Sequence, residues 1–287
     1  MHSIRRYGHV LFVAILFAVN LLIWQGVATS AEAPLLTVAF LDVGQGDSIY
    51  IEAPNGNQLL VDAGAGREVL SELAEVMPVG DRSLDAVIGT HPDKDHIGGL
   101  LDVIRSYEVG QYLEPGVPAD TLIYEELKRA IAEKGIPVTL ARRGMAIVLD
   151  EANGVRLDIL LPDRDVSGME TNDASIVARL SYASTSVMLT GDAPTKAERH
   201  LVSLGNDIAS DILKAGHHGS RTSTGEEFLR AVAPRYAVIS VGKSNRYGHP
   251  HPEVLARLVS FGIPALRTDE EGTVVFMSDG FSFVRDR

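Results

Sequence analysis

The chain has 287 residues, of which 45% are hydrophobic and 22% charged, enough to bury the core of one large domain. Its formal net charge of -12 argues against a dedicated nucleic-acid-binding module, because most of such a surface repels polyanions. The absence of cysteine excludes a thiolate nucleophile, a disulfide and a zinc site with sulfur ligands, so any metal must be held by histidines and carboxylates.

The first 33 residues have the pattern of an export segment. A basic start with Arg5 and Arg6 precedes an apolar run over residues 10–27, and small residues follow at 29–31. We therefore predict a signal peptide or membrane anchor with a short linker over residues 1–33, although a buried core helix is an alternative. Export would place residues 34–287 in the periplasm, outside the cell, or anchored to the outer face of the cytoplasmic membrane.

The elements after residue 34 follow from hydrophobic periodicity and turn signals. In chain order we predict strands at 35–41, 47–52 and 57–61, a helix at 67–77, a strand at 84–89, helices at 97–107 and 125–134, strands at 155–161 and within 175–189, a helix at 193–204, and then strands at 211–214, 236–241, 265–267 and 272–277 alternating with helices at 225–233 and 252–261. Two strand-rich halves, each accompanied by helices, predict an α/β fold with a four-layer αββα sandwich.

The strongest chemical signal is the run THPDKDHIGG at residues 90–99, directly after the strand predicted at 84–89. Its four potential ligands are His91, Asp93, Asp95 and His96. So many facing polar groups would be poorly paired without a cation, which makes a metal the economical interpretation. His91 and Asp93 can face one side of the loop, while Asp95 and His96 begin the helix and can face another. This arrangement suits two ions about 3.5–4 Å apart.

This run resembles the metal motif of the metallo-β-lactamase superfamily, in which a histidine usually stands at the position of Asp93. With aspartate there, it is similar to the extracellular domain of ComEC-type competence proteins. Further motifs of this resemblance occur along the chain, namely FLDVGQGD at 40–47, LVDAG at 60–64, NDAS at 172–175, LTGD at 189–192, KAGHHGS at 214–220 and NRYGHP at 245–250. The resemblance implies a metallo-β-lactamase sandwich and a metal-dependent hydrolase over residues 34–287.

The resemblance also implies the ligands of a first ion. His91 and Asp93 would hold it, with Asp173 in place of a histidine found in many relatives, and Asp192 would bridge to the second ion. Carboxylate oxygens in place of histidine nitrogens are harder ligands, which favour hard cations such as Mn²⁺ and Mg²⁺. We expect two divalent ions, Mn²⁺ or Zn²⁺, with Mg²⁺ as a third candidate. Asp192 could instead cap the helix predicted at 193–204, and Asp173 could belong to a simple turn.

The second ion would be held by Asp95, His96 and His217, in the same resemblance. Asp62 is expected to orient a metal-binding histidine from behind. Asp47 has the pattern of a solvated turn charge and is not expected to be a ligand.

Catalysis and substrate binding are assigned to residues around these ligands. We predict that Asp95, His218 and His249 are catalytic, and that His218 or His249 contacts the scissile phosphate or the leaving oxygen. Three residues are predicted to bind the substrate: Ser220, Lys243 and Arg246. Lys214 is a further candidate for gathering cations that hold phosphate, although basic residues in such loops can also be merely solvated.

The reaction that fits these groups is attack by a metal-bound hydroxide on an ester, with a phosphodiester, and DNA as one candidate, as the preferred substrate. The resemblance adds a link to DNA uptake, but a single apolar segment favours a detached nuclease or phosphodiesterase over a channel. Hydrolysis of a small ester, lactone or β-lactam, and a non-catalytic metal- or nucleotide-binding domain, are the alternatives. The expected partners are the substrate and, through an uncleaved N-terminal segment, the membrane; the sequence identifies no protein partner.

Overall fold

The computed structural model describes residues 12–20 and 35–286. Residues 12–20 form a helix within a first unit, which ends at Leu35, and a second compact unit begins at Leu36. The predicted export segment at 1–33 therefore lies mostly outside the described residues. Within the described ranges, no helix combines the length and the apolar character needed to cross a membrane.

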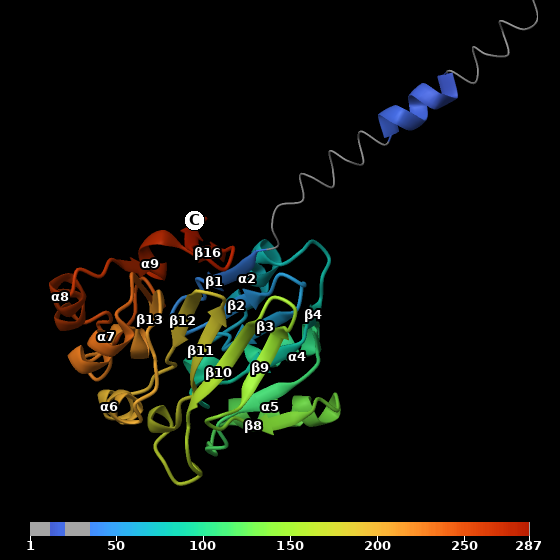
Figure 1. Ribbon diagram of the computed structural model, residues 1–287. Helices are drawn as coiled ribbons and strands as arrows, with labels where there is room; N and C mark the ends of the chain where they lie inside the picture. The colour runs from blue at the N-terminus through green and yellow to red at the C-terminus, as the bar shows by residue number, and fades with distance from the viewer. Residues whose placement is uncertain (1–11, 21–34, 287) are drawn as a thin grey trace, which may run out of the picture. The chain divides into compact units, whose positions relative to one another are not determined.

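Two mixed sheets form the centre of the second unit (Figure 1). The eight-stranded sheet contains, in spatial order, β17 (Phe283–Arg285), β16 (Val274–Ser278), β1 (Leu36–Phe40), β2 (Ile49–Glu52), β3 (Gln58–Val61), β5 (Ala86–Ile88), β7 (Tyr112–Glu114) and β8 (Val138–Leu140). The seven-stranded sheet contains β15 (Ala265–Arg267), β14 (Tyr236–Ile239), β13 (Ile212–Lys214), β12 (Thr185–Leu189), β11 (Val177–Tyr182), β10 (Val155–Leu161) and β9 (Ala146–Asp150). A short parallel pair is formed by β4 (Ser83–Leu84) and β6 (Glu108–Val109).

Helices cover the outer face of each sheet. The first sheet carries α2 (Glu68–Val76), α3 (Lys94–Ile97), α4 (Leu100–Ser106) and α5 (Leu122–Glu133), whose apolar side chains pack in one cluster with that sheet. The second sheet carries α6 (Thr195–Ser203), α7 (Glu226–Val232) and α8 (Pro252–Ser260) in the same way. The remaining helical segments are α9 (Thr268–Glu271) and the two 3-10 turns η1 (Asn172–Ala174) and η2 (Gly216–Gly219).

The alternation of side chains along the strands explains why there are four layers. In β1, Val38 and Phe40 belong to the core between the two sheets, whereas Ala39 belongs to the core between the first sheet and its helices. Because successive strand residues point to opposite faces, a strand that is apolar at every position is buried on both sides. The predicted four-layer αββα sandwich is confirmed.

The predicted elements agree with the structure over most of the chain, with a few differences. The strand expected at 84–89 is divided between β4 and β5, and the helix expected at 97–107 begins earlier, as α3, and is interrupted before α4. Five strands were not predicted: β6, β7, β8, β9 and β17. Two of these lie at the edges of the first sheet, where exposed Val138 and Leu140 in β8 weaken the burial pattern on which the prediction depends.

Candidate metal centre

The candidate centre lies where strands of both sheets end. The loop after β5 carries His91 and leads into α3, which carries Asp95 and His96. In the second sheet, Asp192 follows β12 and the η2 turn follows β13. Because β3 and β5 are parallel, as are β12 and β13, their carboxyl ends lie at one edge of each sheet. Loops at such ends commonly carry the functional residues of α/β proteins.

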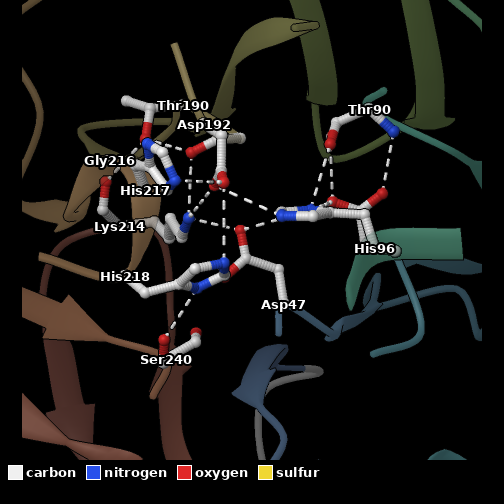
Figure 2. Close-up of polar contacts among 12 residues, drawn as sticks. Asp47, Thr90, His96, Thr190, Asp192, Lys214, Gly216, His217, His218 and Ser240 are labelled. Atoms are coloured by element: carbon white, nitrogen blue, oxygen red, sulfur yellow. Dashed lines mark hydrogen bonds and ion pairs between the residues drawn. The ribbon is translucent and has the colours of Figure 1, made fainter. Parts of the chain in front are cut away.

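His96 and Asp192 join the two sides of the centre. The His96 Nε2 atom lies 3.3 Å from Asp192 Oδ1, and the facing atoms are drawn in Figure 2. The other Asp192 oxygen, Oδ2, lies 4.0 Å from His91 Nε2 and 3.6 Å from His218 Nε2. Asp95 Oδ2 lies 3.5 Å from the same His218 nitrogen. Asp192 therefore faces ligand atoms from both sheets, as a bridging carboxylate must.

Several polar atoms in this cluster are buried and have no hydrogen-bond partner. They are His91 Nε2, His96 Nε2, Asp192 Oδ1, His218 Nε2 and Asp47 Oδ1. Buried polar atoms in folded proteins are normally paired, and an unpaired group costs about 1–3 kcal/mol. Four sets of three residues each bring ligand atoms within 4.8 Å of one another. They are His91, His96 and Asp192; Asp95, His96 and His218; Asp47, Asp192 and His218; and Asp47, Asp62 and His96. The residues present therefore fit divalent cations.

Asp62 supports the centre from behind. Its Oδ2 lies 2.7 Å from His96 Nδ1, and it accepts hydrogen bonds from the Thr90 backbone N–H at 2.7 Å and from the Thr90 hydroxyl at 2.6 Å. A carboxylate on Nδ1 fixes the imidazole orientation and directs Nε2 toward a ligand. This is the arrangement expected of Asp62.

Asp47 and Lys214 form a buried ion pair beside the ligands (Figure 2). Lys214 is fully buried, its Nζ donates to the Gly191 carbonyl at 2.9 Å, and it lies 3.6 Å from Asp192 Oδ1. Two expectations are wrong here. Asp47 is not solvated, since it is 1% exposed, and Lys214 is enclosed by protein, so it cannot be one of the surface cations that gather phosphate.

The turn that carries Asp47 packs directly on the metal-motif loop. A Cβ at Gly46 would lie 2.1 Å from the Asp95 carbonyl oxygen, so only glycine fits this contact. The Asp47 N–H donates to that same carbonyl at 3.1 Å. The GQGD motif therefore holds the backbone of Asp95 in place.

The two adjacent histidines of η2 differ in position from the prediction. His218 is 1% exposed, its Nδ1–H donates to the Ser240 carbonyl at 2.9 Å, and its Nε2 faces Asp95 and Asp192. His217 has a more exposed side chain, and its Nε2 lies 3.5 Å from Asp192 Oδ2, on the outer side of the cluster. His218, predicted to contact substrate, thus occupies the ligand position predicted for His217.

The prediction for Asp173 is also corrected. Its side chain points to Lys196, with Oδ2 3.5 Å from Nζ, and it lines a separate pocket. The preceding residue, Asn172, has its amide nitrogen 3.5 Å from His217 Nδ1 and a buried Oδ1 without a hydrogen-bond partner. Because η1 is helical, neighbouring side chains diverge, and this turn brings Asn172 rather than Asp173 to the centre.

Asp93 and His249 lie at the partly exposed side of the cluster, and Ser220 is buried beside it. Asp93 Oδ2 is 3.7 Å from His91 Nε2, and its side chain is 40% exposed. His249 lies with its ring 5.5 Å from that of His217 and 6.4 Å from that of His218. Ser220 is buried, and its hydroxyl contacts the Thr222 hydroxyl at 3.0 Å.

The two predicted cations of the 243–250 loop are exposed. Arg246 lines a pocket of about 300 Å³ together with Asp95 and Lys94. Lys243 does not line this pocket, so the structure brings only Arg246 of these two predicted substrate contacts next to a candidate ligand.

The charges of the cluster are strongly coupled. Burial alone would raise the pKa of Asp47, but Lys214 and His218 lower this pKa to about 2. Burial would also raise the pKa of Asp192, which His218 and His96 hold well below its ordinary value. Burial and His96 lower the pKa of His91. Asp47 and Asp192 are thus ionised and His91 is neutral near pH 7. Burial would lower the pKa of His218, but Asp192 and Asp47 raise it to about 9, so His218 holds a proton that a bound ion would displace.

Comparisons with known proteins agree with this geometry. Residues 41–243 match the metallo-beta-lactamase superfamily. The chain is 33% identical over 256 residues to ComE operon protein 3 of Bacillus subtilis (strain 168), covering 83% of this chain and 32% of that protein. It is 31% identical over 288 residues to competence protein ComA of Neisseria gonorrhoeae, covering 93% of this chain and 38% of that protein. The chain therefore spans about a third of the length of these curated relatives.

A solved structure shares the fold. Igni18, a metallo hydrolase from the archaeon Ignicoccus hospitalis, matches with a TM-score of 0.53 and 17% identity, covering 84% of this chain and 98% of that chain.

Proposed function

This chain belongs to the metallo-β-lactamase superfamily and is homologous to ComEC-type competence proteins, and from that premise we propose that it is a metal-dependent phosphodiesterase acting outside the cytoplasmic membrane. A nuclease is the narrower form of this proposal. The export pattern of residues 1–33 supports the location.

The observation that carries the proposal is the charge at the mouth of the centre. Lys94 and Arg246 line the same pocket as Asp95, although the protein as a whole has a net charge of -12. No ion pair involving either cation occurs among the described residues. Unpaired cations beside a cluster of metal ligands suit a substrate that carries negative charge next to the bond to be cleaved.

The ligand set suits two ions. His91, Asp93 and Asp192 would hold one, and Asp95, His96 and His218 the other, with Asp192 shared. Divalent ions supply Lewis acidity: they activate water and neutralise charge on a phosphodiester.

The chain's own groups do the positioning. Asp62 orients His96, the Ser240 carbonyl orients His218, and the Asp47–Lys214 pair holds Asp192. His249 carries a buried Nδ1 atom without a hydrogen-bond partner. Burial and the neighbouring His217 lower the pKa of His249 to about 4, so the ring is neutral near pH 7. A neutral imidazole at the mouth can donate a hydrogen bond to a phosphate or leaving oxygen.

The test is hydrolysis of bis-p-nitrophenyl phosphate by the full chain with Mn²⁺, Zn²⁺, Mg²⁺ or EDTA. We expect metal-dependent cleavage that Asp95→Ala reduces at least about 100-fold. Asp158→Ala is the matched control, because this carboxylate pairs with Arg156 on the surface of β10. p-Nitrophenyl acetate serves as a neutral substrate, whose hydrolysis Arg246→Ala should spare.

Two results would count against the proposal. One is an absence of phosphodiester cleavage with every metal. The other is cleavage of the neutral ester that exceeds cleavage of the phosphodiester and is equally sensitive to Asp95→Ala, which would make the protein a carboxylic ester hydrolase.

A further inference from the structure

An aromatic side chain stands at the mouth of the centre, in a position that neither the metal ligands nor the predicted substrate contacts explain. Tyr247 lines the pocket of about 300 Å³ that also includes Lys94, Asp95 and Arg246. The ring is 49% exposed. The ring is therefore accessible to a molecule that enters this pocket.

The loop around Tyr247 is fixed by its own hydrogen bonds. The Asn245 amide donates to the Gly242 carbonyl at 2.9 Å and to the His249 carbonyl at 2.7 Å, and Asn245 Oδ1 accepts from the His249 N–H at 2.9 Å. The Tyr247 ring also lies nearly parallel to that of His249, at 24° with 5.7 Å between the centroids. The aromatic surface is therefore presented in a set orientation, so a ligand need not order it on binding.

Positive charge accompanies the ring. The Arg246 guanidinium lies 5.2 Å from the Tyr247 ring centroid and donates to the Tyr247 hydroxyl at 3.2 Å. Lys94 lines the same pocket and stands directly before Asp95 in the sequence. An aromatic face with flanking unpaired cations is the combination by which proteins bind single-stranded nucleic acid: bases stack on the ring, and cations hold the phosphates.

We propose that Tyr247, Arg246 and Lys94 form a nucleoside subsite, in which a base adjoining the scissile phosphate stacks on Tyr247 and the flanking phosphate contacts the two cations. This inference rests on the proposed phosphodiesterase function and narrows its substrate class to single-stranded oligonucleotides. In a duplex both faces of a base are covered by its neighbours, so only an unpaired or frayed strand offers a face to the ring.

The experiment compares two fluorescently labelled, single-stranded oligonucleotides of eight nucleotides and equal charge. One is oligothymidylate, and the other has the same sugar-phosphate backbone without bases. Their affinities for the full chain are measured by fluorescence anisotropy in EDTA, where the strand is not cut. We expect the base-bearing strand to bind about tenfold or more tightly than the abasic strand. Tyr247→Leu should abolish this preference and Tyr247→Phe should keep it. Phe281→Leu is the matched control, because Phe281 is an exposed aromatic residue in the turn before β17.

The subsite and the proposed function fail in different ways. Equal affinities of the wild-type protein for both strands would overturn the subsite, even if bis-p-nitrophenyl phosphate is cleaved. A preference that survives Tyr247→Leu would overturn it as well. A preference for the base-bearing strand that is lost in Tyr247→Leu and kept in Tyr247→Phe and Phe281→Leu would support the subsite. If the same protein cleaved no phosphodiester with any metal, the catalytic proposal would fall and the subsite would stand.

Discussion

The Oδ2 atom of Asp62 lies 2.7 Å from Nδ1 of His96, while Nε2 of the same imidazole faces Asp192 at 3.3 Å. One ring thus connects a carboxylate behind the centre to the carboxylate that both candidate ions would share. Burial lowers the pKa of His96, but Asp192 and Asp62 together raise it well above its ordinary value. An ion that binds at Nε2 must therefore displace a proton, and metal affinity should rise with pH.

Asp62→Asn should weaken metal binding without removing a ligand. The amide can still accept from Thr90, but it cannot stabilise the Nδ1–H tautomer of His96 as a carboxylate does, so we expect a loss of about 10–100-fold in Mn²⁺ or Zn²⁺ affinity. Competition with a chelator of known affinity measures this, with Asp158→Asn as the surface control. Unchanged affinity would show that Asp62 has only a structural role.

His218→Ala should lower the metal content from two ions per chain to one, because His218 contributes to the Asp95 and His96 group. His217→Ala should keep two ions, since His217 lies on the outer side of Asp192. Metal analysis of the dialysed proteins by mass spectrometry distinguishes the variants. The reverse pattern would restore the ligand role that the sequence assigned to His217.

Lys214→Met should destabilise the fold, because it removes the cation that does most to offset the buried charge of Asp47 and leaves only His218 and His96 beside it. Removal of one partner from a buried ion pair costs about 3–5 kcal/mol. Urea denaturation of the metal-free proteins measures the loss, and the double variant Asp47→Asn with Lys214→Met should recover part of it. If the two substitutions do not interact, the loss of unfolding free energy in the double variant equals the sum of the losses in the two single variants. That result would contradict the pairing of Asp47 with Lys214.

Glu198 should make stability depend on pH. Its carboxylate accepts hydrogen bonds from the backbone N–H groups of Thr224 at 2.5 Å and Gly225 at 2.8 Å, at the end of the loop that follows η2. Burial nevertheless raises its pKa from 4.5 to about 7. The folded state therefore binds a proton more tightly than the unfolded chain, and the contribution of Glu198 is full below pH 4.5 and is lost as the pH rises through 7.

The loss between pH 5 and pH 8 should be roughly 3 kcal/mol at most, from the size of this pKa difference. Urea denaturation at both pH values should show a smaller change for Glu198→Gln than for the wild-type protein, because glutamine does not titrate. Equal changes for the two proteins would mean that Glu198 keeps its ordinary pKa in the folded state.

The sequence predicted the fold and the main cluster because both depend on order along the chain. Buried strands that end in polar loops gave the sandwich, and His91, Asp95, His96 and Asp192 meet as the motif order indicated. These residues lie at strand ends whose positions the apolar runs define. Their roles as ligands stay predictions until metal is measured.

The differences arise where backbone geometry decides between neighbouring residues. His217 and His218 both have positive φ angles, 50° and 54°, so strand or helix spacing cannot tell which ring turns inward. Asn172 and Asp173 lie on a single 3-10 turn, where one position changes the direction of the side chain. The burial of Asp47 also depends on a distant partner, Lys214, which no local pattern reveals.

The contact between His96 and Asp192 has a consequence for the motions of the protein, because the two residues belong to loops of different sheets. Ions held between them would connect the two halves of the sandwich at the edge where the loops meet. Opening of either half would then require loss of the ions, so metal should slow hydrogen–deuterium exchange in β5 and β12 together. In the metal-free protein only the hydrogen bonds and ion pairs among the side chains would connect the two loops, so exchange in β5 and β12 should be faster and less closely coupled.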